Sequence, residues 1–228
     1  MAEFQLNGVT LVIPDDLMTD QLTRAMTSGK YESSEADALL RHLRPRDRFL
    51  DLGAGAGYLS SLAGAAIRAR RVTGVEAGPE MARVAQANLQ RNGIEGGVIH
   101  WGAVVPDSYR EAEITFTVRR SFWASTLTPP EGAKNTRAVV VPALRFGAVL
   151  AQADPTVLSI DIEGGEQDLF DTILPADLRL IIMELHPAVY GKQGTKRIFD
   201  ALSAQGFAYC PQGSKAGTVV FERLPPEV

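Results

Sequence analysis

Cysteine is almost missing from this chain of 228 residues, and Cys210 is the single example. One thiol can form neither a disulfide framework nor a cluster of thiolate ligands, so both are excluded. No apolar run approaches the roughly 20 residues of a membrane-spanning helix, so no membrane partner is expected. An excess of basic residues is also missing, because 23 Lys and Arg face 27 Asp and Glu. A nucleic-acid-binding surface usually needs that excess, so no nucleic-acid partner is expected either.

A secretory leader is the next absence, because the opening residues MAEFQLNGVTLVIPDDL lack a basic segment followed by an apolar core. Together with the single thiol, this predicts a cytoplasmic, reducing setting. The length suits one substantial α/β domain with a buried core. We expect residues 1–30 to form a strand pair and a helix, and residues 31–228 to form the main domain.

Strand–turn–helix units recur from Arg48 onward, and this alternation is the main positive signal in the sequence. We expect such units at 48–67, 71–93, 156–174 and 178–206, a short strand at 96–104, and closing strands at 207–210 and 217–224. Strands that alternate with helices favour an α/β fold with a mostly parallel sheet covered on both faces.

Residues 109–150 interrupt this alternation. Ile114, Phe116 and Val118 alternate with threonines and predict a strand, and a second strand is expected at 138–141 after a turn-rich tract. In open α/β sheets, ligands bind beyond the carboxyl ends of the strands. A hairpin-like insertion at this point is therefore well placed to cover a substrate.

The segment DLGAGAG places Gly53, Gly55 and Gly57 directly after a strand that ends at Asp51. Glycines let the backbone turn sharply and approach a ligand closely. Dinucleotide-binding enzymes use G-x-G-x-x-G, in which a pyrophosphate rests on the helix N-terminus. Here the third glycine comes one residue early, and Tyr58 stands where a small residue is expected. The spacing counts against a nicotinamide-dependent oxidoreductase, which stays an alternative.

Two carboxylates accompany the glycine loop. Asp51 precedes the first glycine by two positions, which suits a cationic amino-acid group better than a pyrophosphate. Glu76 ends the next strand about 20 residues after the glycines, where an acid can bridge ribose hydroxyls. Together these features favour S-adenosylmethionine as the cofactor.

The segment SIDIEGGEQDLF crowds three carboxylates around two glycines at the end of an apolar strand. Asp161 and Glu163 are two positions apart, so they face the same side of a strand. Glu166 is expected in the first turn of a following helix, where the helix dipole favours an acid. We interpret Glu166 as structural.

A second polar pair, Glu184 and His186, follows in IIMELHP with the same spacing. If the two strands are neighbours, four polar groups meet beside the cofactor. A neutral histidine with a pKa of about 6.5 is a better base for a hydroxyl than a carboxylate of about 4, so His186 is the expected base or proton relay. Asp161 and Glu163 would orient the acceptor or the cofactor, and Glu184 would orient His186 or a water. A hard divalent ion is the alternative occupant, although no metal is expected.

Three further kinds of versatile side chain have simpler interpretations. We expect Cys210 to be a small buried residue without a partner to activate it, and His42 to belong to an amphipathic helix. Phe122 and Trp123 could shield a reacting methyl group from water, but aromatic pairs are more often simple packing.

The chain from Tyr31 onward resembles the FkbM family of S-adenosylmethionine-dependent methyltransferases. The resemblance rests on YE at residues 31–32, FLDLGAGAGYLSSLAG, VEAGPE, the GAV after the third strand, SIDIEGGEQDLF and MELHP. It implies a class I, Rossmann-like fold with a seven-stranded sheet. It also implies O-methylation of a hydroxyl on a sugar or a small natural product, so the expected partner is a small-molecule or glycan acceptor. A non-catalytic protein that binds S-adenosylmethionine is a further possibility.

The resemblance also implies a set of cofactor contacts. They are Glu32, Asp51, Gly53, Ala54, Gly55, Gly57, Glu76 and Ala77, with Gly102 and Ala103 near the adenine. The chain departs from the family pattern at Ser159, where members commonly carry a lysine two residues before the first acid of the motif. The resemblance therefore bears on the cofactor site more directly than on the acceptor chemistry, and it fixes neither the acceptor nor the oligomeric state.

Overall fold

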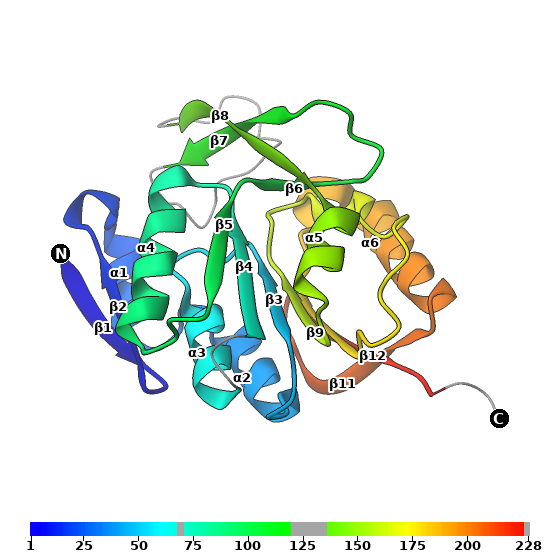
Figure 1. Ribbon diagram of the computed structural model, residues 1–228, viewed down its shortest axis with the longest axis horizontal. Helices are drawn as coiled ribbons and strands as arrows, with labels where there is room; N and C mark the ends of the chain where they lie inside the picture. Colours follow the sequence, from blue (N-terminus) through cyan, green and yellow to red (C-terminus); the bar gives the residue numbers. More distant parts are fainter. Residues whose placement is uncertain (68–70, 120–135, 226–228) are drawn as a thin grey trace.

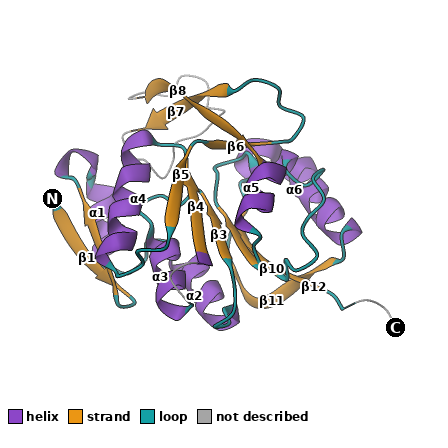
Figure 2. Cartoon of the chain, viewed as in Figure 1, coloured by secondary structure: helices purple, strands orange, loops and turns teal. Residues whose placement is uncertain are grey.

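The computed structural model describes residues 1–67, 71–119 and 136–225. A seven-stranded sheet runs through the centre of the molecule, with helices packed against it (Figures 1 and 2). In spatial order its strands are β11 (Phe207–Lys215), β12 (Thr218–Arg223), β10 (Leu180–Glu184), β9 (Val157–Ile160), β3 (Phe49–Leu52), β4 (Val72–Glu76) and β5 (Val98–Trp101). The strands from β10 to β5 are parallel, and β12 is antiparallel to both of its neighbours. The expected α/β class I methyltransferase fold, with its seven-stranded sheet, is confirmed.

Helices cover both faces of the sheet because its buried strands are apolar on both sides. In β10, Leu180 and Ile182 join one hydrophobic core, while Ile181 and Met183 join the other. The first core is covered by α2 (Ser33–His42), α3 (Tyr58–Ala66) and α4 (Pro79–Arg91), and the second by α5 (Phe146–Ala153) and α6 (Pro187–Ala204). In the described parts of the chain, no helix has both the length and the apolar content that crossing a membrane requires.

The N-terminal residues pack onto the first core. They form β1 (Ala2–Leu6), β2 (Val9–Ile13), a 3-10 turn η1 (Asp15–Leu17) and α1 (Asp20–Thr27). The two strands pair antiparallel, as expected. Asn88 of α4 accepts a hydrogen bond from the backbone N–H of Val12 at 2.9 Å. Leu11 and Leu22 are buried in the same core as the sheet, and a domain division at residue 30 stays a prediction.

Helix ends follow the residue types in α4 but not in α2. Pro79 begins α4, and Gly93 follows its end with a φ of +74°, as the sequence predicts. Glu32 is the N-cap of α2, with a φ of +45°, although Ser33 and Ser34, whose residue type suits an N-cap better, follow it. A left-handed residue that is not glycine is uncommon, and its position here is at the edge of a cavity.

A three-stranded sheet lies across the upper end of the main sheet in Figure 1. It consists of β6 (Ala103–Val105), β8 (Thr136–Arg145) and β7 (Glu113–Arg119), in that order. The strands β7 and β8 pair antiparallel, as expected of a hairpin-like insertion. The last residues of the expected insertion, 146–150, instead begin α5 and pack in the second core. Phe122 and Trp123 lie outside the described residues.

Two expectations about element ends are wrong. The strand expected at 96–104 is divided at Gly102, whose φ is +154°, so β5 and β6 belong to different sheets. The helix expected after the acidic segment is only a 3-10 turn, η4 (Glu166–Asp168). Its first residue turns its carboxylate inward, and the backbone N–H of Gly164 donates to Glu166 Oε2 at 2.9 Å. The expected position for Glu166 was a solvent-facing one in the first turn of a helix, where the helix dipole favours an acid. The bond to Gly164 holds its carboxylate inward instead.

Candidate active site

The glycine loop after β3 is tied to the end of β4. The backbone N–H groups of Gly53 and Ala54 both donate to Val75 O, at 2.9 and 3.0 Å. Gly53 has a φ of +87°, and a Cβ on it would lie 1.8 Å from Asp161 O. Glycine is required at this position because the chain leaving β9 crosses directly against the loop.

Gly57 serves a different contact. It is the N-cap of α3, and a Cβ on it would lie 2.9 Å from the Cα of Ala85 in α4. This glycine therefore lets the helices α3 and α4 pack closely. The sequence interpretation gave all three glycines a role at the ligand, but of the three only Gly53 and Gly55 border the cavity described next.

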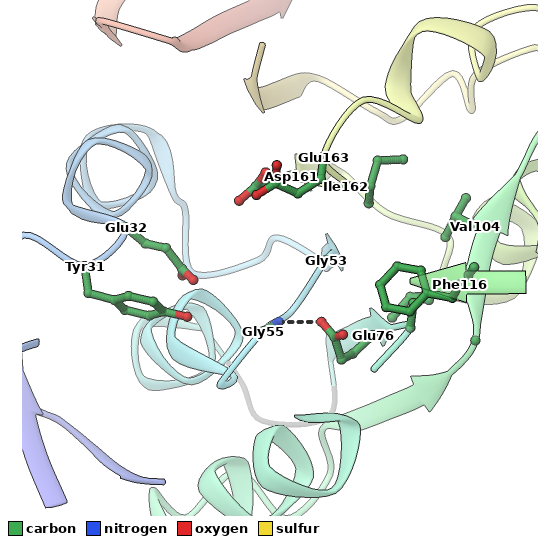
Figure 3. A pocket seen from close by; sticks show the side chains of 14 residues that line it. Tyr31, Glu32, Gly53, Gly55, Glu76, Val104, Phe116, Asp161, Ile162 and Glu163 are labelled. Carbon is green, nitrogen blue, oxygen red and sulfur yellow. Dashed lines mark hydrogen bonds between the residues drawn. The ribbon is translucent and has the colours of Figure 1, made fainter. Parts of the chain in front are cut away.

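A cavity of about 640 Å³ opens at the carboxyl ends of β3 and β4 (Figure 3). Seven of the ten expected cofactor residues line the cavity: Glu32, Gly53, Gly55, Glu76, Ala77, Gly102 and Ala103. The acids expected to be catalytic, Asp161 and Glu163, line it as well.

Three expected cofactor residues do not line this cavity: Asp51, Ala54 and Gly57. Asp51 is only 2% exposed, and its Oδ2 accepts a hydrogen bond from Ser60 Oγ at 2.6 Å. Burial raises the pKa of Asp51 to about 6. The side chain thus braces the start of α3, and Glu32 and Asp161 take the cavity-facing positions that the sequence pattern predicts for Asp51.

Sequence reasoning missed five lining residues: Tyr31, Val75, Val104, Phe116 and Ile162. Tyr31 was visible in the YE motif, and Ile162 stands between the two acids of the acidic segment. Val75, Val104 and Phe116 carry only a strand signal, which gives no indication that they face a ligand. Their apolar side chains suit a flat aromatic group.

Glu76 is fixed by backbone donors on two sides. The N–H of Gly55 donates to Oε2 at 2.8 Å, and the N–H of Gly78 donates to Oε1 at 2.6 Å. Burial raises the pKa of Glu76 to about 7 although these bonds oppose the rise. Each carboxylate oxygen accepts more than one hydrogen bond, so both remain able to receive ribose hydroxyls. The residues present therefore fit an adenosine-containing cofactor.

A second cavity of about 920 Å³ adjoins the first and shares Tyr31, Glu32, Asp161 and Glu163 with it. Five acids line this second cavity, with one lysine: Glu32, Glu35, Asp161, Glu163, Glu184 and Lys30. Burial and the charge of Glu184 raise the pKa of Asp161 well above its ordinary range. Among the described residues, Oδ1 of Asp161 has no hydrogen-bond partner. Oδ1 of Asp161 can therefore accept a hydrogen bond, and the raised pKa makes this carboxylate a stronger base than an ordinary aspartate whenever it is ionised.

Unusual backbone angles gather at this wall. Glu32, Glu163 and Ala216 all have φ between +45° and +54°, and all three line the second cavity. Left-handed residues that are not glycine cost about 1–3 kcal/mol and cluster at functional sites. The strain places the carboxylates of Glu32 and Glu163 where both cavities can reach them.

The imidazole of His186 is held by Glu166, and this corrects the role expected of Glu184. Nδ1 of His186 lies 2.9 Å from Oε1 of Glu166, which is fully buried. Glu166 thus orients the imidazole, a role that sequence reasoning gave to Glu184. Glu184 instead faces the second cavity beside Gly217.

The second ring nitrogen of His186 faces two more acids. Nε2 lies 3.5 Å from both Asp161 Oδ1 and Glu163 Oε2. Burial lowers the pKa of His186, but the hydrogen bond and charge of Glu166 and the charges of Asp161 and Glu163 raise it to about 9. The ring is therefore protonated at neutral pH, and the premise of a neutral histidine base does not hold. The ligand-type atoms of Asp161, Glu163 and His186 all lie within 4.8 Å of one another, a spacing that also allows a divalent cation.

One family model and one relative match part of the chain, and the match to the family model includes the glycine loop. A family model, the methyltransferase small domain, matches residues 28–115, which is less than half of the chain. The ribosomal protein L11 methyltransferase of Thermus thermophilus is 40% identical over 76 residues, which cover 31% of this chain and 28% of that protein. The chain thus matches about a quarter of this relative's length. These matches support S-adenosylmethionine as the cofactor and methyl transfer as the reaction class.

Solved structures of methyltransferases resemble the whole chain at low identity. A putative O-methyltransferase from Klebsiella pneumoniae has a TM-score of 0.49 and 14% identity, over 93% of this chain and 92% of that one. M. jannaschii TYW2 in complex with AdoMet has a TM-score of 0.49 and 12% identity, over 97% and 86%. None of these matches is to the FkbM family, so that resemblance stays a prediction.

Proposed function

We propose that this protein is an S-adenosylmethionine-dependent methyltransferase that methylates a hydroxyl of a sugar or of another small polyhydroxylated acceptor. One observation carries the proposal: Asp161 and Glu163 form a wall common to the cofactor cavity and the acidic second cavity. A methyl group bound on one side of this wall and a hydroxyl bound on the other would meet at the same carboxylates.

The first cavity suits the parts of S-adenosylmethionine in turn. Glu76 would receive the ribose hydroxyls, and the apolar pair Val104 and Phe116 would pack near the adenine beside Gly102. Glu32 and Asp161 supply negative charge for the amino group and the sulfonium. The resemblance to the FkbM family agrees with this placement and remains part of the proposal.

In the proposed reaction the acceptor oxygen attacks the methyl carbon in line with the carbon–sulfur bond. The carbon–oxygen bond forms, the carbon–sulfur bond breaks, and S-adenosylhomocysteine leaves. The hydroxyl proton passes to Asp161, whose Oδ1 is buried and has no hydrogen-bond partner among the described residues. His186 stands 3.5 Å from that atom and serves as the charged partner and relay, not as the primary base. Positioning supplies much of the acceleration in such a displacement.

An amine acceptor is the second candidate, and the charge of the second cavity favours it. Five acids face a single lysine there, which suits a cationic ligand as well as a polyol. The relative with local sequence identity is named as a methyltransferase of a ribosomal protein. An amine would lose its proton to the same Asp161 before attack.

A nicotinamide-dependent oxidoreductase and a non-catalytic binding protein both have less support. Dinucleotide-binding sheets typically follow the order 3-2-1-4-5-6, whereas here β12, antiparallel to both neighbours, lies between β10 and β11. A non-catalytic protein that binds S-adenosylmethionine would not need the acidic second cavity. A cytoplasmic setting and the lack of nucleic-acid and membrane partners belong to the proposal as well.

A thermal-shift panel tests the cofactor. S-Adenosylmethionine and S-adenosylhomocysteine should raise the melting temperature because they bind the native state, and NAD should not. Stabilisation by NAD alone would remove the methyl-donor assignment.

A methyl-transfer assay tests the acceptor, with labelled cofactor and parallel panels of sugars and primary amines. We expect labelled sugars; labelled amines alone would select the second candidate, and cofactor binding without any labelled product would select a non-catalytic role. His186→Ala should lower turnover at least about 100-fold, while cofactor affinity stays within about threefold, because His186 does not line the first cavity. Full turnover in this variant would remove His186 from the reaction.

A further inference from the structure

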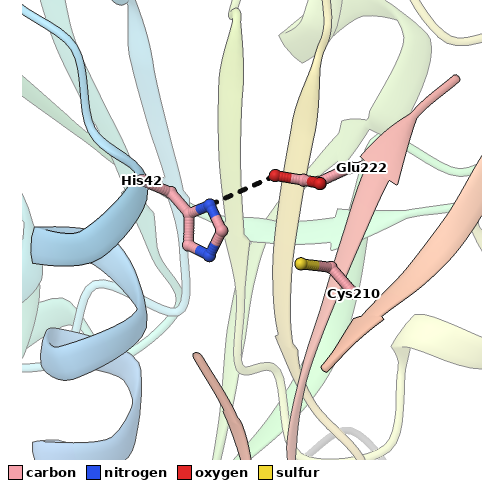
Figure 4. Close-up of side chains that lie close together, drawn as sticks. All are labelled: His42, Cys210 and Glu222. Atoms are coloured by element: carbon pink, nitrogen blue, oxygen red, sulfur yellow. Dashed lines mark ion pairs between the residues drawn. The ribbon is translucent and has the colours of Figure 1, made fainter. Parts of the chain in front are cut away.

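A second group of potential ligands lies away from the cavities, between α2 and the edge of the main sheet. His42 is the last residue of α2, Cys210 lies in β11, and Glu222 lies in the neighbouring β12 (Figure 4). One ligand-type atom from each residue lies within 4.8 Å of the other two. Cys210 is buried as expected, and burial and the charge of Glu222 raise the pKa of its thiol, but it has two neighbours of ligand type. Cys210 and the side chain of His42 are buried, and Glu222 is half-exposed.

The imidazole of His42 is oriented by the backbone. Its Nε2 lies 2.9 Å from Gln212 O, and because a carbonyl only accepts, Nε2 carries the hydrogen. Nδ1 then points at Glu222 Oε1, 3.2 Å away. A lone pair and a carboxylate oxygen repel each other at that distance unless a positive charge, either a proton or a metal ion, lies between them. A backbone carbonyl that fixes the far ring nitrogen is the usual support for a metal-binding histidine.

The strand β11, which contains Cys210, does not pair regularly with β12 beside these three residues. Between Cys210 and Lys215 the register of β11 against β12 shifts. Ser214 Oγ pins the bulge, because it donates to Cys210 O at 2.6 Å and accepts from the N–H of Val220 at 2.9 Å. The same bulge turns Gln212 O toward His42 and places it 3.6 Å from Cys210 Sγ. Bulges are features that aim side chains, and here three potential ligands converge.

We propose that His42 Nδ1, Cys210 Sγ and Glu222 bind a zinc ion. Thiolate, imidazole and carboxylate are the three ligand types that zinc takes in proteins, and borderline-soft zinc tolerates all three together. Zn–N and Zn–O distances of about 2.0–2.2 Å place tetrahedral neighbours about 3.3–3.6 Å apart, so the 3.2 Å between Nδ1 and Oε1 needs to widen only slightly. Water reaches the half-exposed Glu222 side and supplies the fourth ligand.

The ion would clamp α2 to β11 and β12. The opposite end of α2 begins beside Glu32, a residue of the cofactor cavity. The zinc site would thus fix the helix that positions one wall of the candidate active site. It does not depend on the proposed reaction, because its atoms lie outside both cavities.

Cobalt substitution tests the site directly, because Cys210 is the only cysteine in the chain. Co²⁺ added to protein stripped with a chelator should produce a sulfur-to-cobalt charge-transfer absorption in the near ultraviolet, saturating at one ion per chain. Zn²⁺ should abolish this absorption by competition. Cys210→Ser should eliminate it, and Glu222→Gln should weaken Co²⁺ binding at least about tenfold. Asp161→Asn, which changes the acidic cluster beside His186, should leave the absorption intact.

Thermal denaturation gives an independent measurement. Zinc at a hundredfold excess over its Kd should raise the melting temperature of the wild type by roughly 5–10 °C, and that of Cys210→Ser by less than about 2 °C. Zinc should also slow the reaction of the wild-type thiol with a disulfide reagent, a test that needs no variant. Cobalt binding without the sulfur band, or equal reactivity of the thiol with and without zinc, would overturn the proposal. His42 and Glu222 would then be an ion pair bridged by a proton.

Discussion

Two carboxylates beside the glycine loop have different roles. Asp51 lies inside the sheet and bonds to Ser60, whereas Glu76 borders the cavity and receives the N–H groups of Gly55 and Gly78. Burial raises the pKa of both acids, to about 6 and about 7. The sequence could locate both because each ends an apolar strand. The sequence could not show that one acid faces the core and the other a ligand. That difference depends on how far along its strand each acid lies, and a shift of two residues is enough to change it.

The raised pKa of Asp51 makes its contribution to stability depend on pH. The folded protein holds this proton up to about pH 6, while the unfolded chain releases it near 3.8, so the free energy of unfolding falls as pH rises between these values. Asp51→Asn removes this loss and still accepts from Ser60. We expect the variant to gain roughly 2–3 kcal/mol relative to the wild type between about pH 4 and pH 7.

Urea denaturation at several pH values measures this difference. Asp171→Asn, at an exposed position, is the matched control and should follow the wild-type curve throughout. Parallel curves for Asp51→Asn and the wild type would show that the carboxyl at 51 is ionised in the folded protein at acid pH.

At the scale of the element, the strands were predictable and the turn after β9 was not. Apolar runs identify β3, β4, β9 and β10, because burial on both faces leaves little choice of residue. The segment after Ile160 resembles a helix start, but Glu166 bonds inward to Gly164 and His186 instead. Such a choice depends on a histidine 20 residues later in the chain, and no local pattern contains it.

Gly53 offers a test of how tightly β3 and β9 are joined at their ends. Alanine at 53 would place its Cβ 1.8 Å from Asp161 O, so the chain at 161 must move. Gly29 is the control, because it also has a positive φ, of +69°, but open space around it. Gly29→Ala should cost about 1–2 kcal/mol for the left-handed backbone alone.

Gly53→Ala should cost at least about 2 kcal/mol more than the control, measured by urea denaturation, and should weaken cofactor binding at least about tenfold. An equal cost for the two variants would mean that the loop yields freely and that the contact with Asp161 is not rigid.

At the scale of the molecule, acidic side chains gather where the sheet ends. The net charge is only -4, yet six acids line the two cavities, among them Glu76 and Glu184. Composition gives the small total, and only the fold brings acids from four separate segments together. The sequence therefore could not predict that these acids form one surface, although it predicted several of them as site residues.

The electrostatic field of these acids should strengthen the binding of S-adenosylmethionine more than that of S-adenosylhomocysteine. S-Adenosylmethionine carries one more positive charge than S-adenosylhomocysteine, and the two differ little otherwise. Raising sodium chloride from about 0.05 M to about 0.5 M shortens the screening length severalfold. We expect the Kd of the charged cofactor to rise roughly threefold to tenfold, and that of the product by less than about twofold, by isothermal titration calorimetry. An equal rise for both ligands would show that the cavity acids are protonated or too distant to act on the sulfonium.

The contact between Gly53 and the carbonyl of residue 161 has a practical consequence for engineering. The glycine loop, which lines the first cavity, and the chain at Asp161, which lines both cavities, pack directly against each other. A chimera that takes the segment around Asp161 from another methyltransferase would collide with the glycine loop at Gly53 unless the loop were replaced as well. Specificity in this scaffold should therefore be exchanged as a two-part cassette, and libraries that vary only one part should be enriched in unfolded clones.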